Sequence, residues 1–172
     1  MNTDILTATN APVEVVINSQ QYLSFILAGE EYATNILKVL EIRDWTSSTL
    51  IPNSPDYLEG VMNLRGDIIP IINLRTRFQL PPSEQNYQRI VIVLDIESAG
   101  KNRAMGLLVD AVAATYDVDM NKVRPAPMSC SVIDDDFISG LITLDNNMVI
   151  LLDVDQLLNF GLLGLSQAEN NT

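Results

Sequence analysis

Histidine is absent from the 172 residues, and cysteine occurs once, as Cys130. Histidine is the commonest general base and zinc ligand, so its absence excludes Ser-His and Cys-His nucleophile pairs and Cys/His zinc sites. The glycine-rich patterns that cradle nucleotide phosphates are missing as well. A single cysteine excludes an internal disulfide, which fits a reducing cytosol. The chain therefore has few of the groups that catalysis or cofactor binding requires.

Basic residues are also few, because ten Lys and Arg face 22 Asp and Glu and give a formal net charge of −12. This charge repels nucleic-acid phosphates and anionic membrane surfaces, so we expect neither as a partner. It suits either a solvated acidic surface or attraction to a basic patch on another protein. No apolar run approaches the ~20 residues of a membrane span, and no basic residue precedes Lys38 to begin a signal peptide. We expect a cytoplasmic protein without direct membrane insertion.

The chain does contain an internal repeat. Residues 60–78 and 140–158 align without a gap at an offset of 80, and both open on glycine and share their apolar positions. Each copy predicts a strand, a tight turn, a second strand and a short helical cap. The copies differ at the turn, which is Arg65-Gly66-Asp67 in the first and Asp145-Asn146-Asn147 in the second. One pair is too few for a solenoid, so two small related barrels are the better interpretation.

The rest of the chain follows the same plan. Short β-branched and aromatic runs bounded by polar turns predict further strands, at 22–28, 32–35, 39–43, 89–96, 104–112 and 115–118.

The proline-containing segment 81–88 is the expected linker between two halves. We expect an all-β fold in which 21–80 and 89–160 each form a five-stranded β-barrel with short helical caps. Residues 1–20 are expected to form a flexible tail, and 161–172 a C-terminal tail.

Prolines mark two local features. Ser54, Pro55 and Gly60 have the spacing of a capped one-turn helix. Pro70 lies inside the second strand of the first hairpin and cannot donate to a neighbouring strand, which predicts an edge or a bulge there. The matching residue is Ile150, which predicts fuller pairing in the second copy.

Arg65 and Gly66 form the tip of the first predicted hairpin, next to a strand with large apolar side chains on both faces. Such a strand must be covered by the second barrel or by another protein. Arg65 offers a fork of donors that matches a carboxylate, although an ordinary solvated turn is the alternative. Glu41 interrupts the apolar run 36–43. If Glu41 lies near Arg65, the two form an oriented polar spot on an apolar surface; otherwise Glu41 is a surface residue of a core strand.

Carboxylates support a different hypothesis, that of a metal-binding protein or a carboxylate-based enzyme. Asp134-Asp135-Asp136 could hold calcium or magnesium, although the spacing does not fit an EF-hand loop and a solvated loop is the alternative. Asp95 and Asp110 lie on neighbouring predicted strands and could face each other as an acid–base pair.

Four segments resemble the CheW-like domain family of bacterial chemotaxis: 22–43, 53–78, 105–113 and 140–158. The resemblance covers about residues 20–160. It implies two SH3-like five-stranded barrels packed around an apolar groove, with no catalysis, cofactor or metal. It also implies an adaptor that couples the cytoplasmic tips of chemoreceptors to the regulatory domain of the histidine kinase CheA, at the inner face of the membrane. A scaffold in another chemosensory pathway, such as twitching motility or surface sensing, is the alternative.

The same resemblance implies functional residues. Arg65 matches the receptor-coupling arginine of the family, and Gly60 opens the strand that leads to it. Receptor or kinase contacts are implied at Ile36, Val39, Glu41, Gly66, Ile90 and Thr115.

Overall fold

The computed structural model describes residues 18–84, 88–127 and 135–159. The two tails expected from the sequence lie almost wholly outside these ranges, and so do Cys130 and Asp134. Ser19 and Gln20, which were expected in the N-terminal tail, belong to the first strand.

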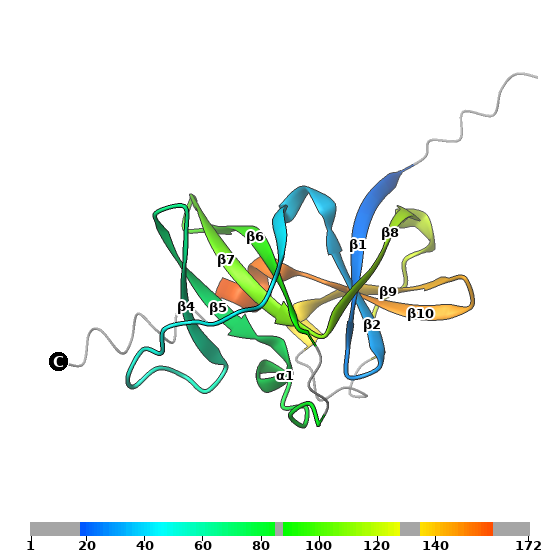
Figure 1. The fold of residues 1–172 in the computed structure, drawn as a ribbon. Coiled ribbons are helices and arrows are strands. Elements are labelled where there is room, and N and C mark those ends of the chain that lie inside the picture. Colours follow the sequence, from blue (N-terminus) through cyan, green and yellow to red (C-terminus); the bar gives the residue numbers. More distant parts are fainter. Residues whose placement is uncertain (1–17, 85–87, 128–134, 160–172) are drawn as a thin grey trace, which may run out of the picture.

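Two five-stranded sheets make up the described fold (Figure 1). In the order in which the strands pair, sheet A contains β8 (Ala111–Asp119), β1 (Ser19–Leu27), β2 (Glu30–Asn35), β10 (Asn147–Leu152) and β9 (Ile138–Leu144). In the same order, sheet B contains β3 (Val39–Asp44), β6 (Ile90–Ser98), β7 (Lys101–Val109), β5 (Asp67–Asn73) and β4 (Leu58–Leu64). The all-β class with two five-stranded units is confirmed.

The two sheets do not correspond to the two halves of the chain. Sheet A combines β1 and β2 with three strands from the second half, and sheet B combines β3, β4 and β5 with two. The predicted division into barrels at 21–80 and 89–160 therefore does not match the strand membership. The physical reason lies in two parallel pairings between distant segments, in which Ile71 of β5 pairs with Gly106 of β7 and Leu151 of β10 pairs with Ala33 of β2.

The repeated segments have the same conformation. Each hairpin turns through two residues with positive φ, at 55° and 95° for Arg65 and Gly66 and at 49° and 67° for Asp145 and Asn146. This is the type I′ turn, whose twist matches that of antiparallel strands. A short helix follows each hairpin, α1 (Leu74–Arg77) in the first copy and 154–159 in the second. The predicted repeat of strand, turn, strand and helical cap is confirmed.

Asparagine and aspartate cap these helices at equivalent positions. The Asn73 side chain accepts a hydrogen bond from the Thr76 amide at 3.3 Å, and the Asp153 carboxylate accepts one from the Gln156 amide at 3.1 Å. Each satisfies an amide of the first turn that has no partner within the helix.

The helix predicted at 54–60 is wrong. Pro55 and Leu58 close a single turn, in which the Leu58 amide donates to the Pro55 carbonyl at 3.0 Å, and β4 begins at Leu58. Leu58 is buried and pairs with Ile72, so strand pairing and burial override the local helix signals. Ser54 does not cap a helix but donates from its hydroxyl to the Ile51 carbonyl.

Pro70 lies where β5 has a partner on one side, because pairing with β7 begins one residue later, at Ile71. Ile150 pairs on both sides, with Leu141 and with Tyr32. Both predictions drawn from the proline position are confirmed.

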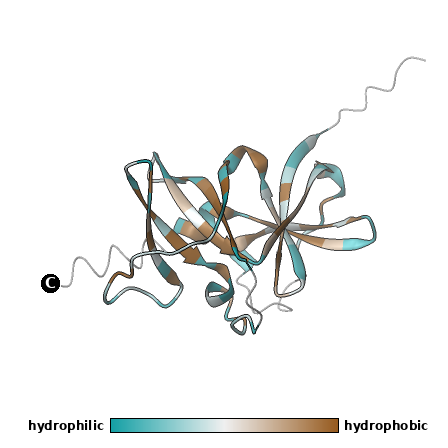
Figure 2. Cartoon of the chain, in the orientation of Figure 1, coloured by the Kyte–Doolittle hydropathy of each residue, from teal (hydrophilic) through white to brown (hydrophobic). Residues whose placement is uncertain are grey.

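One large apolar core fills the space between the sheets, and a smaller core lies against each sheet. Hydrophobic residues are spread along the strands of both sheets, while most turns are hydrophilic (Figure 2). Within the large core, the Tyr32 ring stacks on Phe25 at a centroid distance of 6.0 Å and meets Phe78 in a tilted arrangement at 5.7 Å. Because each sheet contributes side chains to this core, neither sheet would keep its apolar face covered if it were alone.

A largely buried ion pair joins the sheets at the point where the chain crosses from β7 to β8. The Asp110 carboxylate accepts from Arg75 at 2.8 Å (Nε to Oδ1) and 2.5 Å (Nη2 to Oδ2), and from the Ala28 amide at 2.8 Å. Burial raises the pKa of Asp110, but hydrogen bonds from Arg75 and Ala28 outweigh it, so the pKa lies below the usual value. Arg75 also donates to the Pro81 carbonyl and so holds the start of the linker.

We predict that Asp110→Asn lowers the free energy of unfolding by about 1–3 kcal/mol at pH 7, because a charge-assisted contact between the sheets is lost. A depressed pKa stabilises the fold above the unfolded pKa of about 3.9, and this contribution is lost as pH falls through the folded pKa. In urea unfolding between pH 2.5 and 7, the free energy of unfolding should therefore fall less steeply with acidification in the variant than in the parent protein. Asp95→Asn is the control, because this half-buried carboxylate accepts from the Asn102 side chain rather than from an arginine. An unchanged acid slope in Asp110→Asn would contradict the prediction.

Candidate protein-docking site

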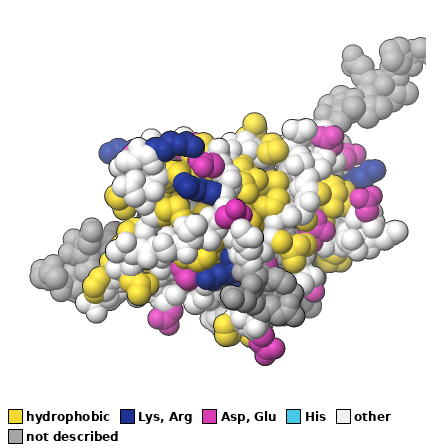
Figure 3. Space-filling view, viewed as in Figure 1, with side chains coloured by type: hydrophobic (Ala, Val, Ile, Leu, Met, Phe, Trp, Pro, Cys, Tyr) yellow, Lys and Arg dark blue, Asp and Glu magenta, His cyan; other side chains and the backbone are white. Residues whose placement is uncertain are grey.

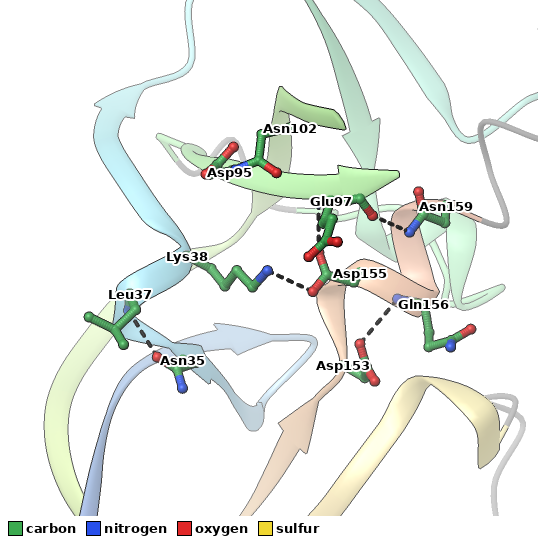
Figure 4. Close-up of polar contacts among 10 residues, drawn as sticks. All are labelled: Asn35, Leu37, Lys38, Asp95, Glu97, Asn102, Asp153, Asp155, Gln156 and Asn159. Atoms are coloured by element: carbon green, nitrogen blue, oxygen red, sulfur yellow. Dashed lines mark hydrogen bonds and ion pairs between the residues drawn. The ribbon is translucent and has the colours of Figure 1, made fainter. Parts of the chain in front are cut away.

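The chain first crosses from sheet A to sheet B through the 3-10 turn η2 (Ile36–Lys38), which is held at both ends. The Asn35 side chain accepts from the Leu37 amide at 2.9 Å, and Lys38 Nζ lies 2.7 Å from Asp155 Oδ2 (Figure 4). Leu37 is 87% exposed, and its side chain points away from this ion pair (Figure 4). A large apolar side chain is thus held in solvent by a fixed backbone.

β3 continues from this turn as an edge strand that pairs with β6 on one side. Its side chains alternate, with Val39 and Glu41 half-buried and Leu40 and Ile42 exposed by 58% and 43%. We call Leu37, Leu40 and Ile42 the apolar strip. Figure 3 shows hydrophobic side chains gathered in the middle of one face of the molecule, with Lys and Arg side chains grouped on the side of sheet B. Exposed apolar residues on an edge strand are typical of a protein contact.

Arg65 meets Glu41, as the sequence hypothesis required. Arg65 Nη2 lies 3.0 Å from Glu41 Oε2, and Arg43 Nε lies 3.9 Å from the other carboxylate oxygen. The Arg65 side chain remains 78% exposed, whereas that of Glu41 is 25% exposed. Glu41 therefore orients a guanidinium whose surface is still largely open to a partner.

The Arg65–Glu41 contact also indicates that sheet B is curled. β3 and β4 lie at opposite ends of the strand order, so contact between Glu41 and the tip of the β4–β5 hairpin requires the sheet to curl. An exposed ion pair of this kind contributes about 0.2–1 kcal/mol, too little to hold the sheet in that shape. The curl comes from the buried side chains, and the ion pair fixes the direction of Arg65.

The two glycines of this region have different positions. Gly66 is exposed at the hairpin tip, where its amide donates to the Asn63 side chain at 2.9 Å. Gly60 is buried, with a φ of 143°, and an added Cβ would lie 2.5 Å from both the Ser48 hydroxyl oxygen and the Thr49 carbonyl oxygen. Gly60 therefore offers no surface to a partner, and its glycine is needed for the close approach of the 48–49 segment to β4.

The remaining residues implied by the family resemblance are dispersed. Ile36 and Val39 are half-buried beside the apolar strip. Ile90 begins β6 opposite Asp44 and packs against the large core. Thr115 is exposed, but it lies on β8 in sheet A, opposite Leu23. The structure thus brings Glu41, Arg65 and Gly66 together with the η2–β3 segment, and places Thr115 on the other sheet.

The sequence marked the apolar run 36–43, but Leu37, Leu40 and Ile42 were not singled out as its exposed residues. The alternation of Leu40 and Ile42 with Glu41 and Arg43 was available as a signal of a half-exposed strand. The strand predicted at 68–74 was expected to need cover on both faces. Ile69, Ile71 and Ile72 are buried, while Ile68 beside the turn is 63% exposed.

The carboxylate hypothesis finds no support in the described part of the chain. Within it, no group of three or more acidic, cysteine or histidine residues is placed to hold a metal ion. The predicted Asp95–Asp110 pair is wrong, because Asp95 lies opposite Ala104 on β7 and accepts from Asn102, whereas Asp110 is bound to Arg75.

None of the helices in the described ranges is both long enough and apolar enough to cross a membrane.

Comparison with known proteins identifies the family. The model of the CheW-like domain matches residues 21–160. The chain belongs to the CheW-like domain family. It is 39% identical to the chemotaxis protein CheW of Klebsiella aerogenes over 140 residues, which cover 81% of this chain and 82% of that protein. It is 33% identical to a probable chemotaxis protein CheW of Rhizobium etli over 138 residues, which cover 80% and 86%.

A solved structure agrees with the fold. The crystal structure of the scaffolding protein TtCheW from Thermoanaerobacter tengcongensis superposes with a TM-score of 0.72 at 34% identity, over 81% of this chain and 87% of that one. Family membership makes this chain an adaptor of the CheW type, which is a non-catalytic scaffold rather than an enzyme.

We predict that Leu40→Ser leaves the fold intact, with a change in the free energy of unfolding of less than about 0.5 kcal/mol, because Leu40 is already exposed. Leu94→Ala, at a fully buried leucine of the neighbouring strand β6, should cost about 2–5 kcal/mol. Urea unfolding measures both. A loss in Leu40→Ser as large as that in Leu94→Ala would show that the apolar strip belongs to the core.

Proposed function

We propose that this protein couples the cytoplasmic tips of chemoreceptors to the regulatory domain of the histidine kinase CheA, without chemistry of its own. It would then lie in the cytoplasm, at the inner face of the membrane, held there by the receptors. The observation that carries the proposal is the apolar strip on η2 and β3 beside an arginine that Glu41 orients. Membership of the CheW-like family supports the choice of partners.

The site is suited to a partner contact that buries a modest area and is specific. Exposed apolar side chains on a fixed backbone supply binding energy with little loss of conformational entropy, and a few anchors carry most of it. The area buried with each partner would be near or below ~800 Å². Arg65 would set the register by pairing with a carboxylate of the partner more than it raises affinity. Repetition of such contacts in an array then supplies avidity.

We predict that Arg65→Ala impairs activation of CheA by receptors in a reconstituted mixture, because the oriented donor fork is lost. Arg103→Ala provides the control, since Arg103 is an exposed arginine near the start of β7 in the same sheet. The kinase assay should be paired with urea unfolding, in which both variants stay within about 1 kcal/mol of the parent protein. Unchanged kinase activation by Arg65→Ala would refute this role.

We also predict that Leu37→Ser weakens capture of a receptor-tip fragment or of the CheA regulatory domain by about tenfold or more, the loss expected of an anchor residue. Leu50→Ser is the matched control, because Leu50 is 77% exposed on a loop outside the apolar strip. Pull-down at several salt concentrations separates apolar binding, which persists in salt, from charge steering, which fades. Equal binding of both fragments by Leu37→Ser and Leu50→Ser would remove the apolar strip from the proposal.

A further inference from the structure

Two ion pairs occupy equivalent positions in the internal repeat. Arg75 in α1 and Asp155 in the 154–159 helix correspond at the repeat offset of 80. Their partners also correspond, because Asp110 lies where the chain passes from β7 to β8 and Lys38 where it passes from β2 to β3. Each ion pair thus ties a repeat helix to a point at which the chain changes sheet.

Parallel strand pairing explains why these residues meet. β5 runs parallel to β7, so Arg75 just beyond β5 meets Asp110 just beyond β7. β10 runs parallel to β2, so Asp155 meets Lys38 at 2.7 Å (Figure 4). Asp155 and its helix are further fixed to sheet B, since the Glu97 amide donates to Asp155 at 3.0 Å (Figure 4). The polarity of the two pairs is reversed: the helix supplies the cation in the first and the anion in the second.

A competing arrangement exists because the two hairpins resemble each other. If β5 paired with β2 and β10 with β7, the matched apolar positions of the repeat would still face a core. Loop closure favours this exchange at β2, because β5 follows β2 after two strands, whereas β10 lies near the other end of the chain. The exchange would place β1, β2, β4 and β5 in one sheet with β8, and β6, β7, β9 and β10 in the other with β3, which is closer to the division that hydrophobic pattern alone predicts.

The charges oppose this exchange. Arg75 would then face Lys38, and Asp155 would face Asp110, so both native attractions would become repulsions. Side-chain size opposes it as well. Gly106 of β7 leaves the space that Ile71 Cδ1 fills, whereas β2 carries Ala33 at the equivalent position. Thus β5 fits β7 in charge and in shape, whereas β2 opposes it in charge and carries a Cβ where β7 has none.

We propose that the charge-reversed ion pairs Arg75–Asp110 and Lys38–Asp155 select the native strand pairing while the protein folds. The two ion pairs give the folding reaction its specificity. Each attracts one repeated hairpin to its native partner strand, and the same charges repel the other hairpin from that strand. This role is independent of any partner of the adaptor.

The experiment compares two variants at the second ion pair. The inverted variant, Lys38→Asp with Asp155→Lys, restores an ion pair in the native arrangement but gives both pairs the same polarity, so the exchanged arrangement is no longer repelled. The neutral variant, Lys38→Asn with Asp155→Asn, has no ion pair there in either arrangement. Its amide oxygen at position 155 can still accept from the Glu97 amide. Refolding from urea is followed by size exclusion and by the fluorescence of the single tryptophan, Trp45.

We expect the inverted variant to refold to native monomer with a rate or yield roughly two- to fivefold below that of the neutral variant, the range that partly exposed ion pairs support. Refolding of the inverted variant as well as or better than the neutral one would overturn the proposal, because the regained ion pair would then only stabilise.

The inverted variant loses the acceptor of the Glu97 amide and places a carboxylate at position 38 near Glu97 and Asp95, so lower native stability alone would also reduce its refolding. Both variants are therefore also made with Arg75→Gln and Asp110→Asn, where the exchanged arrangement gains no ion pair. Selection of pairing predicts that the deficit of the inverted variant disappears in that background, whereas simple destabilisation predicts that it persists.

A second comparison is used if the inverted variant yields no native protein. Lys38→Asp with Asp155→Asn differs from the neutral variant only in a carboxylate at position 38, which can meet Arg75 in the exchanged arrangement but has no cationic partner at position 155 in the native one. It should refold more slowly or with lower yield than the neutral variant. Equal refolding of these two variants would also overturn the proposal.

Discussion

The fold depends on two parallel strand pairings that join segments far apart in the chain, β5 with β7 and β10 with β2. They place strands from both halves in each sheet, so neither half contains a complete sheet of its own. The large core between the sheets, with Phe25, Leu74 and Leu107 fully buried, forms only when both pairings are made. The two sheets therefore behave as one unit, which is what an adaptor that holds partners in a fixed relation requires.

The mixing of strands from both halves of the chain also sets the position of the proposed docking site. The chain must cross from β2 in sheet A to β3 in sheet B, and the crossing is the turn that carries Leu37. Because β3 ends up at the edge of sheet B, Leu40 and Ile42 on one of its faces remain uncovered, while Glu41 on the other meets Arg65. The apolar strip and the oriented arginine are thus consequences of where the chain changes sheet.

Much of the local structure follows from the sequence, because it depends on neighbours in the chain. The repeat at 60–78 and 140–158 predicts both hairpins, their tight turns and their capped helices, and the position of Pro70 predicts the edge within β5. The Arg65–Glu41 contact was one of two alternatives that the sequence left open, and it is the one that the structure contains. Which strands form each sheet was not predicted, because apolar periodicity shows which face of a strand is buried but not which strand lies beside it.

The missed features depend on distant contacts. Ser54, Pro55 and Gly60 have helix-like spacing, but Leu58 is drawn into β4 by its pairing with Ile72. The need for glycine at position 60 comes from Ser48 and Thr49, which hydrophobic pattern does not place near it. Asp110 looked like a possible catalytic acid until the structure placed it against Arg75 at the crossing between the sheets.

We propose that the η2–β3 segment and Arg65 form the surface that partners recognise. Backbone amide chemical shifts test it most directly, recorded while the CheA regulatory domain and a receptor-tip fragment are each added to the labelled protein. We expect at least one of them to shift a continuous set of amides from Leu37 to Arg43, together with those of Arg65 and Gly66. Shifts confined to sheet A, around Thr115 and the β9–β10 hairpin, with none in the η2–β3 segment, would contradict it.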